Sequence, residues 1–311
     1  MVLRQLCHMK FENVAIVGVA HVDAPHRVTT AELEAPLAET YARMGLPQRF
    51  LEPLTGVRAR RFWDVGTMPS DAAALAAEKV IAQSNVNRNR IGFLVNTSVS
   101  RDYLEPSVAC FVHHKLQLSE TCHNFDIANA CLGFLDGMQV VGNLIERGQI
   151  DYGLVVDGES SRNVVERTVD RLRQASCDER TLREQLATLT VGSGAAAMLL
   201  SHARLAPNGH RFVGAVSLAD TQHNQLCRGQ PDFGLTDAKR LLEHGVALAH
   251  RTWARAQTEL TVTSESIDLL AMHQVSASNT QELARALKLD LFKAPLIYPE
   301  LGNVGPASIP I

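Results

Sequence analysis

The segment 131–147 limits the folds open to this chain more than any other. In helical form it is apolar on almost every side, because it contains Leu132, Phe134, Leu135, Met138, Val140, Val141, Leu144 and Ile145. Such a helix must be buried between other elements. Gly133 and Gly137 lie four residues apart on one face, which allows that face to touch another backbone. We therefore expect a layered fold with this helix inside it.

Segments with strand and helix patterns alternate along the chain, which is typical of α/β proteins. We expect strands at 13–19, 91–97, 122–128, 151–157, 190–200, 211–218, 267–272 and 295–298, and helices at 30–44, 70–84, 105–117, 131–147, 162–174, 235–257 and 276–287. Two pairs of segments share a layout: 91–98 is similar to 267–274, and 122–137 is similar to 295–311. This faint repeat predicts two stacked halves, each with a sheet between helices.

Composition excludes several classes of protein. A chain of 311 residues with 46% hydrophobic residues can bury a large core, and a net charge of −3 gives no reason to expect nucleic acid. The longest early apolar run, Val14 to Ala20, is too short to span a bilayer and predicts a strand. Six cysteines without a C-x-x-C pair or repeated Cys/His spacing predict free thiols in a reducing, cytoplasmic setting and no metal site.

Cys131 stands where the strand at 122–128 gives way to the buried helix. The first turn of a helix offers unpaired N–H groups and the positive end of its dipole, which favour a thiolate and can bind an oxyanion. Its small neighbours Ala128, Ala130 and Gly133 allow a substrate to approach. The alternative is a buried structural cysteine, since free cysteines are often part of the core.

His273 and Asn303 follow two other apolar runs. His273 ends the run at 267–272, and Asn303 lies in the turn at 300–306, in which Pro306 suits the start of a helix. Sites of open α/β sheets lie beyond the carboxyl ends of strands, so turns that carry Cys, His and Asn can meet in one pocket. A single His or Asn at such a place is more often an ordinary turn residue, but the set predicts an active site.

These residues resemble those of a known family. The order of Cys131, His273 in M-H-Q and Asn303 in G-N-V-G-P-A-S is similar to the thiolase superfamily, specifically the ketoacyl synthase III branch that condenses acyl thioesters. Further blocks, which resemble condensing enzymes of bacterial long-chain olefin synthesis, are H-V-D-A-P-H (21–26), T-S-V-S-R-D-Y-L-E-P-S (97–107), A-N-A-C-L (128–132), V-V-D-G-E (155–159), L-C-R-G (226–229) and H-Q-V-S (273–276).

The resemblance implies the five-layered αβαβα thiolase fold. Its first half would be residues 9–205 with the nucleophile, and its second half residues 206–311, with 1–8 as an optional extension. It further implies a homodimer, acyl-CoA as substrate with no other cofactor, and later enzymes of the olefin pathway as partners.

Glu105 precedes a proline that can open a helix. Taken alone, it is an acid placed favourably near the positive end of a helix. In the enzymes that this segment resembles, the matching glutamate reaches the active site of the partner subunit and deprotonates the second acyl chain.

Arg58, Arg60 and Arg61 lie in T-G-V-R-A-R-R, which is similar to a T-G-I-R-x-R-R segment near the coenzyme A channel of the family. Guanidinium groups can hold phosphates. The alternative is a solvated face or a turn held by salt bridges.

The residue types favour one reaction. A thiolate of Cys131 would attack a thioester, a second acyl thioester would lose its Cα proton to Glu105, and His273 with Asn303 would stabilise the enolate. The product would be a β-ketoacyl thioester. The alternative is a decarboxylative ketoacyl synthase, which needs no carboxylate base, and Glu105 favours the first reading. Acyl chain length stays open.

The sequence departs from the family pattern where it stops, at Pro310-Ile311. Related chains continue through a helix and a strand pair whose glycine-rich turn donates a backbone N–H to the oxyanion. We therefore expect an incomplete C-terminal half with weak turnover, and a third alternative is an inactive dimerising scaffold.

Overall fold

The computed structural model describes residues 8–311. The strands are β1 (His8–Lys10), β2 (Val14–Asp23), β3 (His26–Thr29), β4 (Ala59–Phe62), β5 (Ile91–Asn96), β6 (His123–Asp126), β7 (Tyr152–Glu159), β8 (Gly194–His202), β9 (His210–Arg211), β10 (Gly214–Val216), β11 (Cys227–Gln230) and β12 (Phe233–Thr236). The α-helices are α1 (Thr30–Glu34), α2 (Ala38–Arg43), α3 (Leu51–Thr55), α4 (Pro69–Ser84), α5 (Val108–Lys115), α6 (Gly133–Glu146), α7 (Arg162–Leu172), α8 (Glu179–Gln185), α9 (Ala238–Glu259), α10 (Ala277–Leu287) and α11 (Tyr298–Leu301). Short 3₁₀ helices include η3 (Ala130–Leu132), η4 (Leu186–Thr190) and η8 (Gly305–Ser308).

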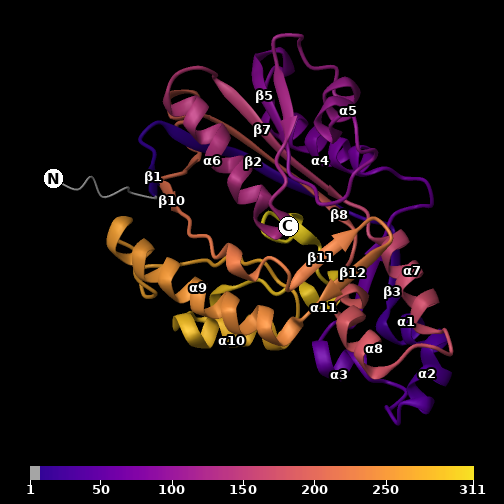
Figure 1. Ribbon diagram of the computed structural model, residues 1–311. Helices are drawn as coiled ribbons and strands as arrows, with labels where there is room; N and C mark the ends of the chain where they lie inside the picture. Colours follow the sequence, from indigo (N-terminus) through magenta and orange to yellow (C-terminus); the bar gives the residue numbers. More distant parts are fainter. Residues whose placement is uncertain (1–7) are drawn as a thin grey trace.

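A six-stranded mixed sheet forms the centre of the chain, in the order β6-β5-β7-β8-β2-β9. β5 runs parallel to β6 and β7, whereas β8 runs antiparallel to β7 and β2. Helices α4 and α5 pack on one face and α6 packs on the other (Figure 1). The predicted first half, a sheet between helices, is confirmed.

The predicted burial of the segment after Cys131 is also confirmed. Phe134, Val141 and Ile145 of α6 are fully buried against the sheet. A Cβ added at Gly137 would lie 2.9 Å from the side chains of Thr97 and Val155, so only glycine lets α6 lie this close to β5 and β7. The regular helix begins at Gly133, two residues later than predicted, because Cys131 belongs to η3.

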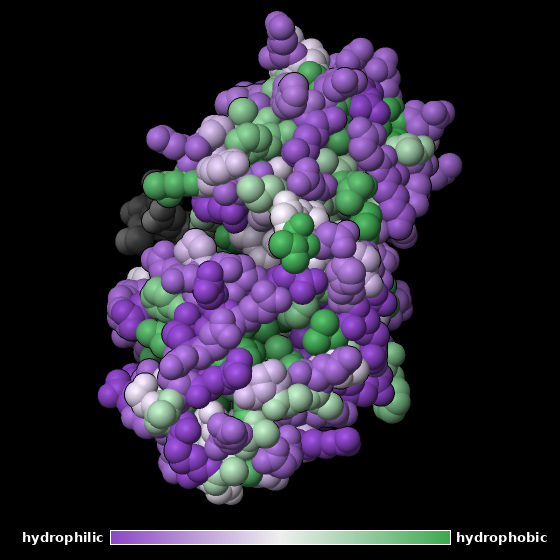
Figure 2. All heavy atoms as spheres, turned by 90° about the vertical axis from the view of Figure 1, so that its right-hand side faces the viewer, coloured by the Kyte–Doolittle hydropathy of each residue, from purple (hydrophilic) through white to green (hydrophobic). Residues whose placement is uncertain are grey.

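A second hydrophobic cluster lies beside the sheet. It joins the antiparallel pair of β3 and β4 to α7, α8 and the short helices between Thr30 and Thr55. Leu37, Tyr41 and Leu172 are fully buried in this cluster. The predicted helix 30–44 is broken at Pro36 into short pieces, because proline lacks the N–H that a helix interior needs. On the face that lies to the right in Figure 1, polar residues predominate and apolar ones form small groups (Figure 2).

The predicted sheet of the second half, with strands at 267–272 and 295–298, does not form in the described residues. Segment 267–272 forms no strand, and its backbone contact is the bond from Leu270 N to Lys293 O at 2.9 Å. Segment 295–298 runs into α11. An apolar run becomes a strand only where a neighbouring strand completes its hydrogen bonds, and neither segment has such a neighbour in residues 8–311. Helices α9 and α10 instead pack on each other.

The short extension predicted at 1–8 lies almost wholly outside the described residues, and His8 already belongs to β1, which pairs with β10. Between residues 8 and 311, none of the helices combines the length and the apolar character needed to cross a membrane.

Gly158→Ala should destabilise the fold by about 1–3 kcal/mol, the usual range for overpacking. An added Cβ would clash with the carbonyl oxygen of Pro69 and lie 2.7 Å from Ala73 N, both in the backbone of α4. The measurement is urea unfolding. The matched control is Gly245→Ala in α9, where an added Cβ meets no atom within 4 Å and should be neutral or slightly stabilising. Equal unfolding midpoints for the two variants would contradict the prediction.

Candidate active site

Cys131 lies in a tight turn between β6 and α6. Ala130 before it has a φ of 44°, a left-handed conformation that costs energy for any residue but glycine. Burial raises the pKa of the Cys131 thiol to about 12, and the nearby Glu159 carboxylate adds to the rise. Desolvation therefore opposes the effect expected of a helix start, which is to favour a thiolate.

Asn303 is fixed by its own turn. Its backbone forms a parallel bridge with Val191, and its side-chain Oδ1 accepts a hydrogen bond from Gly305 N at 3.0 Å. Because Oδ1 is occupied as an acceptor, the amide nitrogen is the group left to donate to a substrate oxygen. This arrangement fits the predicted role of Asn303 as a donor.

His273 is held by Ser308, whose Oγ lies 2.7 Å from Nδ1. Ser308 Oγ also donates to Gly305 O at 2.6 Å. Since the serine has a single proton, Nδ1–H donates to Ser308 and the lone pair stays on Nε2. Burial lowers the pKa of His273 to about 4, so the imidazole is neutral at pH 7. The predicted donation to an enolate, if made from Nε2, requires the other tautomer.

The turns that carry these residues meet in space. Segment η8, which contains Gly305 and Ser308, packs against η3, α6, β7 and β8. The C-terminal segment accordingly lies beside the start of α6 in Figure 1. The structure thus brings the turn of Cys131 together with the turns of His273 and Asn303, as the sequence predicted.

Two acids of β7 also belong to the site, and they were not among the predicted residues. Glu159 is 6% exposed, and burial raises its pKa to about 7. Asp157 is fully buried, and burial together with the charge of Glu159 raises its pKa well above the usual range. The sequence held a signal, because two acids at alternate positions in an otherwise apolar strand lie on the same side of it.

Glu105 is exposed in the loop between β5 and α5, and it makes no hydrogen bond or ion pair with Cys131, His273 or Asn303 of its own chain. The loop is anchored where β6 ends, because Asp126 accepts hydrogen bonds from Val108 N and Ala109 N at the start of α5.

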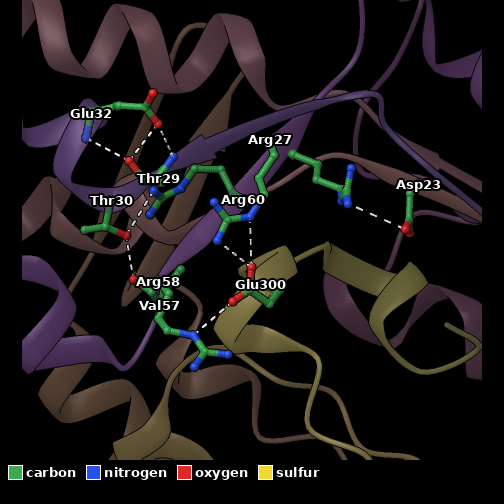
Figure 3. A network of polar contacts seen from close by, with 10 residues as sticks. Asp23, Arg27, Thr29, Thr30, Glu32, Val57, Arg58, Arg60 and Glu300 are labelled. Carbon is green, nitrogen blue, oxygen red and sulfur yellow. Dashed lines mark hydrogen bonds and ion pairs between the residues drawn. The ribbon is translucent and has the colours of Figure 1, made fainter.

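Arg60 does not fit the predicted coenzyme site. Its side chain is 1% exposed and donates to Thr30 Oγ1 at 3.1 Å and to Leu189 O at 2.8 Å (Figure 3). A guanidinium enclosed in this way holds the protein together and cannot reach a phosphate. Burial correspondingly lowers the pKa of Arg60 to about 10.

Arg58 remains at the surface, whereas Arg61 is partly buried and donates to Ala24 O at 3.1 Å. Arg58 pairs with Glu300 at 2.9 Å, and Arg27 pairs with the same carboxylate at 2.7 Å (Figure 3). Arg61 lies 3.9 Å from Asp23. The backbone of Arg58 also donates to Pro299 O of α11 at 2.8 Å, which places this cluster a few residues from Asn303.

No group of three potential metal-ligating side chains is found in residues 8–311. The cysteines in the same range are all free.

The fold and the site define a thiolase-like condensing enzyme. Residues 125–221 match the model of the family 3-oxoacyl-[acyl-carrier-protein (ACP)] synthase III. The chain is 44% identical over 303 residues to the acyl-CoA:acyl-CoA alkyltransferase of Xanthomonas campestris pv. campestris, covering 97% of this chain and 90% of that protein. It is 38% identical over 315 residues to the Shewanella oneidensis enzyme of the same name, with the same coverage. The chain belongs to the acyl-CoA:acyl-CoA alkyltransferase family.

The solved structures that it resembles include OleA of Xanthomonas campestris. The cerulenin-bound form superposes with a TM-score of 0.96 at 44% identity, covering 97% of this chain and 88% of that one. A variant with bound lauric acid and lauroyl-CoA has a TM-score of 0.95, covering 97% and 89%. The predicted incompleteness of the C-terminal half is not confirmed by these comparisons and stays a prediction.

The stability that His273 contributes should be lost in acid. Its pKa is 6.5 when unperturbed and about 4 in the folded chain. Between these values the unfolded chain binds more protons, so stability falls as pH falls from about 6.5 to about 4. His273→Asn lacks this titration. The free energy of unfolding of the parent, minus that of the variant, should therefore decrease as pH is lowered from about 6.5 to about 4. A difference that stays constant over this range would contradict a buried neutral imidazole.

Proposed function

We propose that this protein joins two acyl-CoA molecules in a non-decarboxylative Claisen condensation. The observation that carries the proposal is the meeting of Cys131, His273 and Asn303 around η8. It is supported by identity to acyl-CoA:acyl-CoA alkyltransferases and by likeness to an OleA structure that holds lauroyl-CoA. Other OleA structures carry a replaced cysteine, glutamate or histidine, and the intervals between those positions equal those between Cys131, Glu105 and His273.

The first step is acylation of Cys131. The thiol loses its proton, its sulfur bonds to the thioester carbonyl carbon, and coenzyme A leaves as a thiol. An oxyanion forms on the way, and each preorganised donor lowers that barrier by about 3–4 kcal/mol. The Asn303 amide is such a donor, and neutral His273 adds a second in its Nε2–H tautomer.

The second step forms the carbon–carbon bond. A carboxylate removes the Cα proton of the second acyl-CoA, the resulting enolate attacks the acyl carbon on sulfur, and the Cys131 sulfur leaves. The product is a β-ketoacyl-CoA. Glu105 is the proposed base, and because it is exposed and makes no hydrogen bond with Cys131, His273 or Asn303 of its own chain, we propose that it acts in the site of a partner subunit, as the resemblance implies.

A homodimer that pairs along β6 would allow this. β6 is the edge strand of the central sheet, so its outer backbone groups face no other strand in residues 8–311. Phe125 of β6, together with Leu132 and Leu135 just beyond it, is between 36% and 49% exposed. Apolar side chains on a free strand edge favour pairing with a second copy of the same surface. Glu105 belongs to the loop anchored at the end of that strand.

Arg58 and Arg61 are the proposed contacts for the phosphates of coenzyme A. Arg58 is 60% exposed and shares Glu300 with Arg27, so an arriving phosphate can compete for these guanidiniums. The contact of their segment with α11 supports the proposal that they bind a ligand whose thioester lies at Asn303.

The cytoplasm is the proposed location, since free cysteines suit a reducing compartment. The β-keto product would pass to later enzymes of olefin synthesis.

Cys131→Ala should abolish the acyl adduct that long-chain acyl-CoA leaves on the parent protein, because it removes the nucleophile. Intact-mass measurement after incubation checks this. Cys110→Ala and Cys227→Ala, at exposed thiols, are the controls and should keep the adduct. An adduct that persists on Cys131→Ala would assign another nucleophile. A parent that forms none would instead favour the scaffold alternative.

Glu105→Gln should keep the adduct and lose condensation, because only the second step removes a Cα proton. Mixing it with Cys131→Ala, by unfolding and refolding the two together, should restore condensation. In such a mixed dimer one site combines an intact Cys131 with the Glu105 of the other subunit. Each variant alone should stay inactive, and absence of recovery in verified mixed dimers would place the base within one chain.

A further inference from the structure

The carboxyl group of Glu159 accepts hydrogen bonds from two residues of the loop after β5. Its Oε1 accepts a hydrogen bond from Val99 N at 2.6 Å, and its Oε2 accepts from Ser100 Oγ at 2.7 Å and from Ser100 N at 3.2 Å. Ser100 Oγ in turn accepts from Ser160 N at 3.1 Å. The carboxyl group thereby fastens the loop after β5 to the end of β7.

The same carboxyl group supports the turn of Asn303. A Cβ added at Gly305 would lie 3.3 Å from the carboxyl carbon of Glu159 and 3.4 Å from its Oε1. Gly305 holds the side chain of Asn303 through its N–H and binds Ser308, which holds His273. Glu159 therefore lies between the turn that positions the donors and the loop that continues to Glu105.

Charge links Glu159 to the nucleophile as well. After burial, the Glu159 carboxylate is the largest cause of the raised pKa of Cys131. The other titratable groups around this pair are Asp157 on β7, Cys227 on β11 and, through Ser308, His273. Arg101, which follows the fastened loop, pairs with Asp126 at 3.6 Å. Within residues 8–311, no ion pair with a cation offsets the negative charge of Glu159.

We propose that Glu159 is a positioning residue that holds the Val99–Ser100 loop against the Gly305 turn. The role in condensation rests on the proposed function, whereas the fastening of the loop does not.

The test is hydrogen exchange at the backbone N–H groups of Val99 and Ser100, followed by mass spectrometry of the peptide that contains them. This measurement needs no acyl-CoA, so it is independent of whether the proposed reaction occurs. Both groups should be protected in the parent, because they donate to the Glu159 carboxyl group. Exchange in the folded parent at the rate of an unprotected loop would overturn the fastening.

Variants assign the protection to Glu159. Glu159→Gln and Ser100→Ala each weaken the hydrogen bonding between the side chain of Glu159 and the loop, so exchange at Val99 and Ser100 should be at least several-fold faster than in the parent. If Glu159→Gln does not fold, Ser100→Ala alone decides, and unchanged exchange there overturns the assignment.

The positioning role has its own readout. Glu159→Gln and Ser100→Ala should both lower the condensation rate at least several-fold while the acyl adduct on Cys131 still forms. The matched control is Glu34→Gln, at another buried glutamate. One oxygen of Glu34, Oε1, accepts hydrogen bonds from both Phe50 N and Leu51 N, and the amide oxygen of glutamine can accept the same two bonds. This variant should preserve the protection of the Val99–Ser100 loop and the condensation rate. Condensation at the parent rate in Glu159→Gln would refute the positioning role.

Discussion

The packing of α6 on the central sheet is the contact on which the rest of the site depends. Gly133 and Gly137 bring the helix so close to Thr97 and Val155 that no larger residue fits without a shift. The helix therefore begins directly over the carboxyl ends of β5 and β7, and Cys131 is held at the turn that leads into it. The Asn303 and His273 turns then reach the nucleophile because η8 packs against both α6 and η3.

Burial sets the charge states of this site. It raises the pKa of the Cys131 thiol, lowers that of His273 and raises that of Glu159. All these shifts favour the neutral forms, so the resting site has a thiol and an uncharged imidazole.

The arrangement also separates the two half-reactions. Acylation uses Cys131 and donors from the same chain, whereas the proposed base is located in an exposed loop anchored at the edge strand β6. The Glu159 carboxyl group connects that loop to the donor turns through Val99 and Ser100. One buried acid would thus hold together segments that come from distant parts of the sequence.

The sequence by itself determined the α/β class, the burial of the helix after Cys131 and the convergence of Cys131, His273 and Asn303, because periodicity and strand-end positions are local properties of a chain. Only the tertiary structure decided which arginine is enclosed, as Arg60 is, and which apolar runs become strands, as 267–272 does not. It likewise decided that the Cys131 thiol is neutral and that Glu159 joins the site. Each of these depends on desolvation and on partners distant in the chain, which no local pattern encodes.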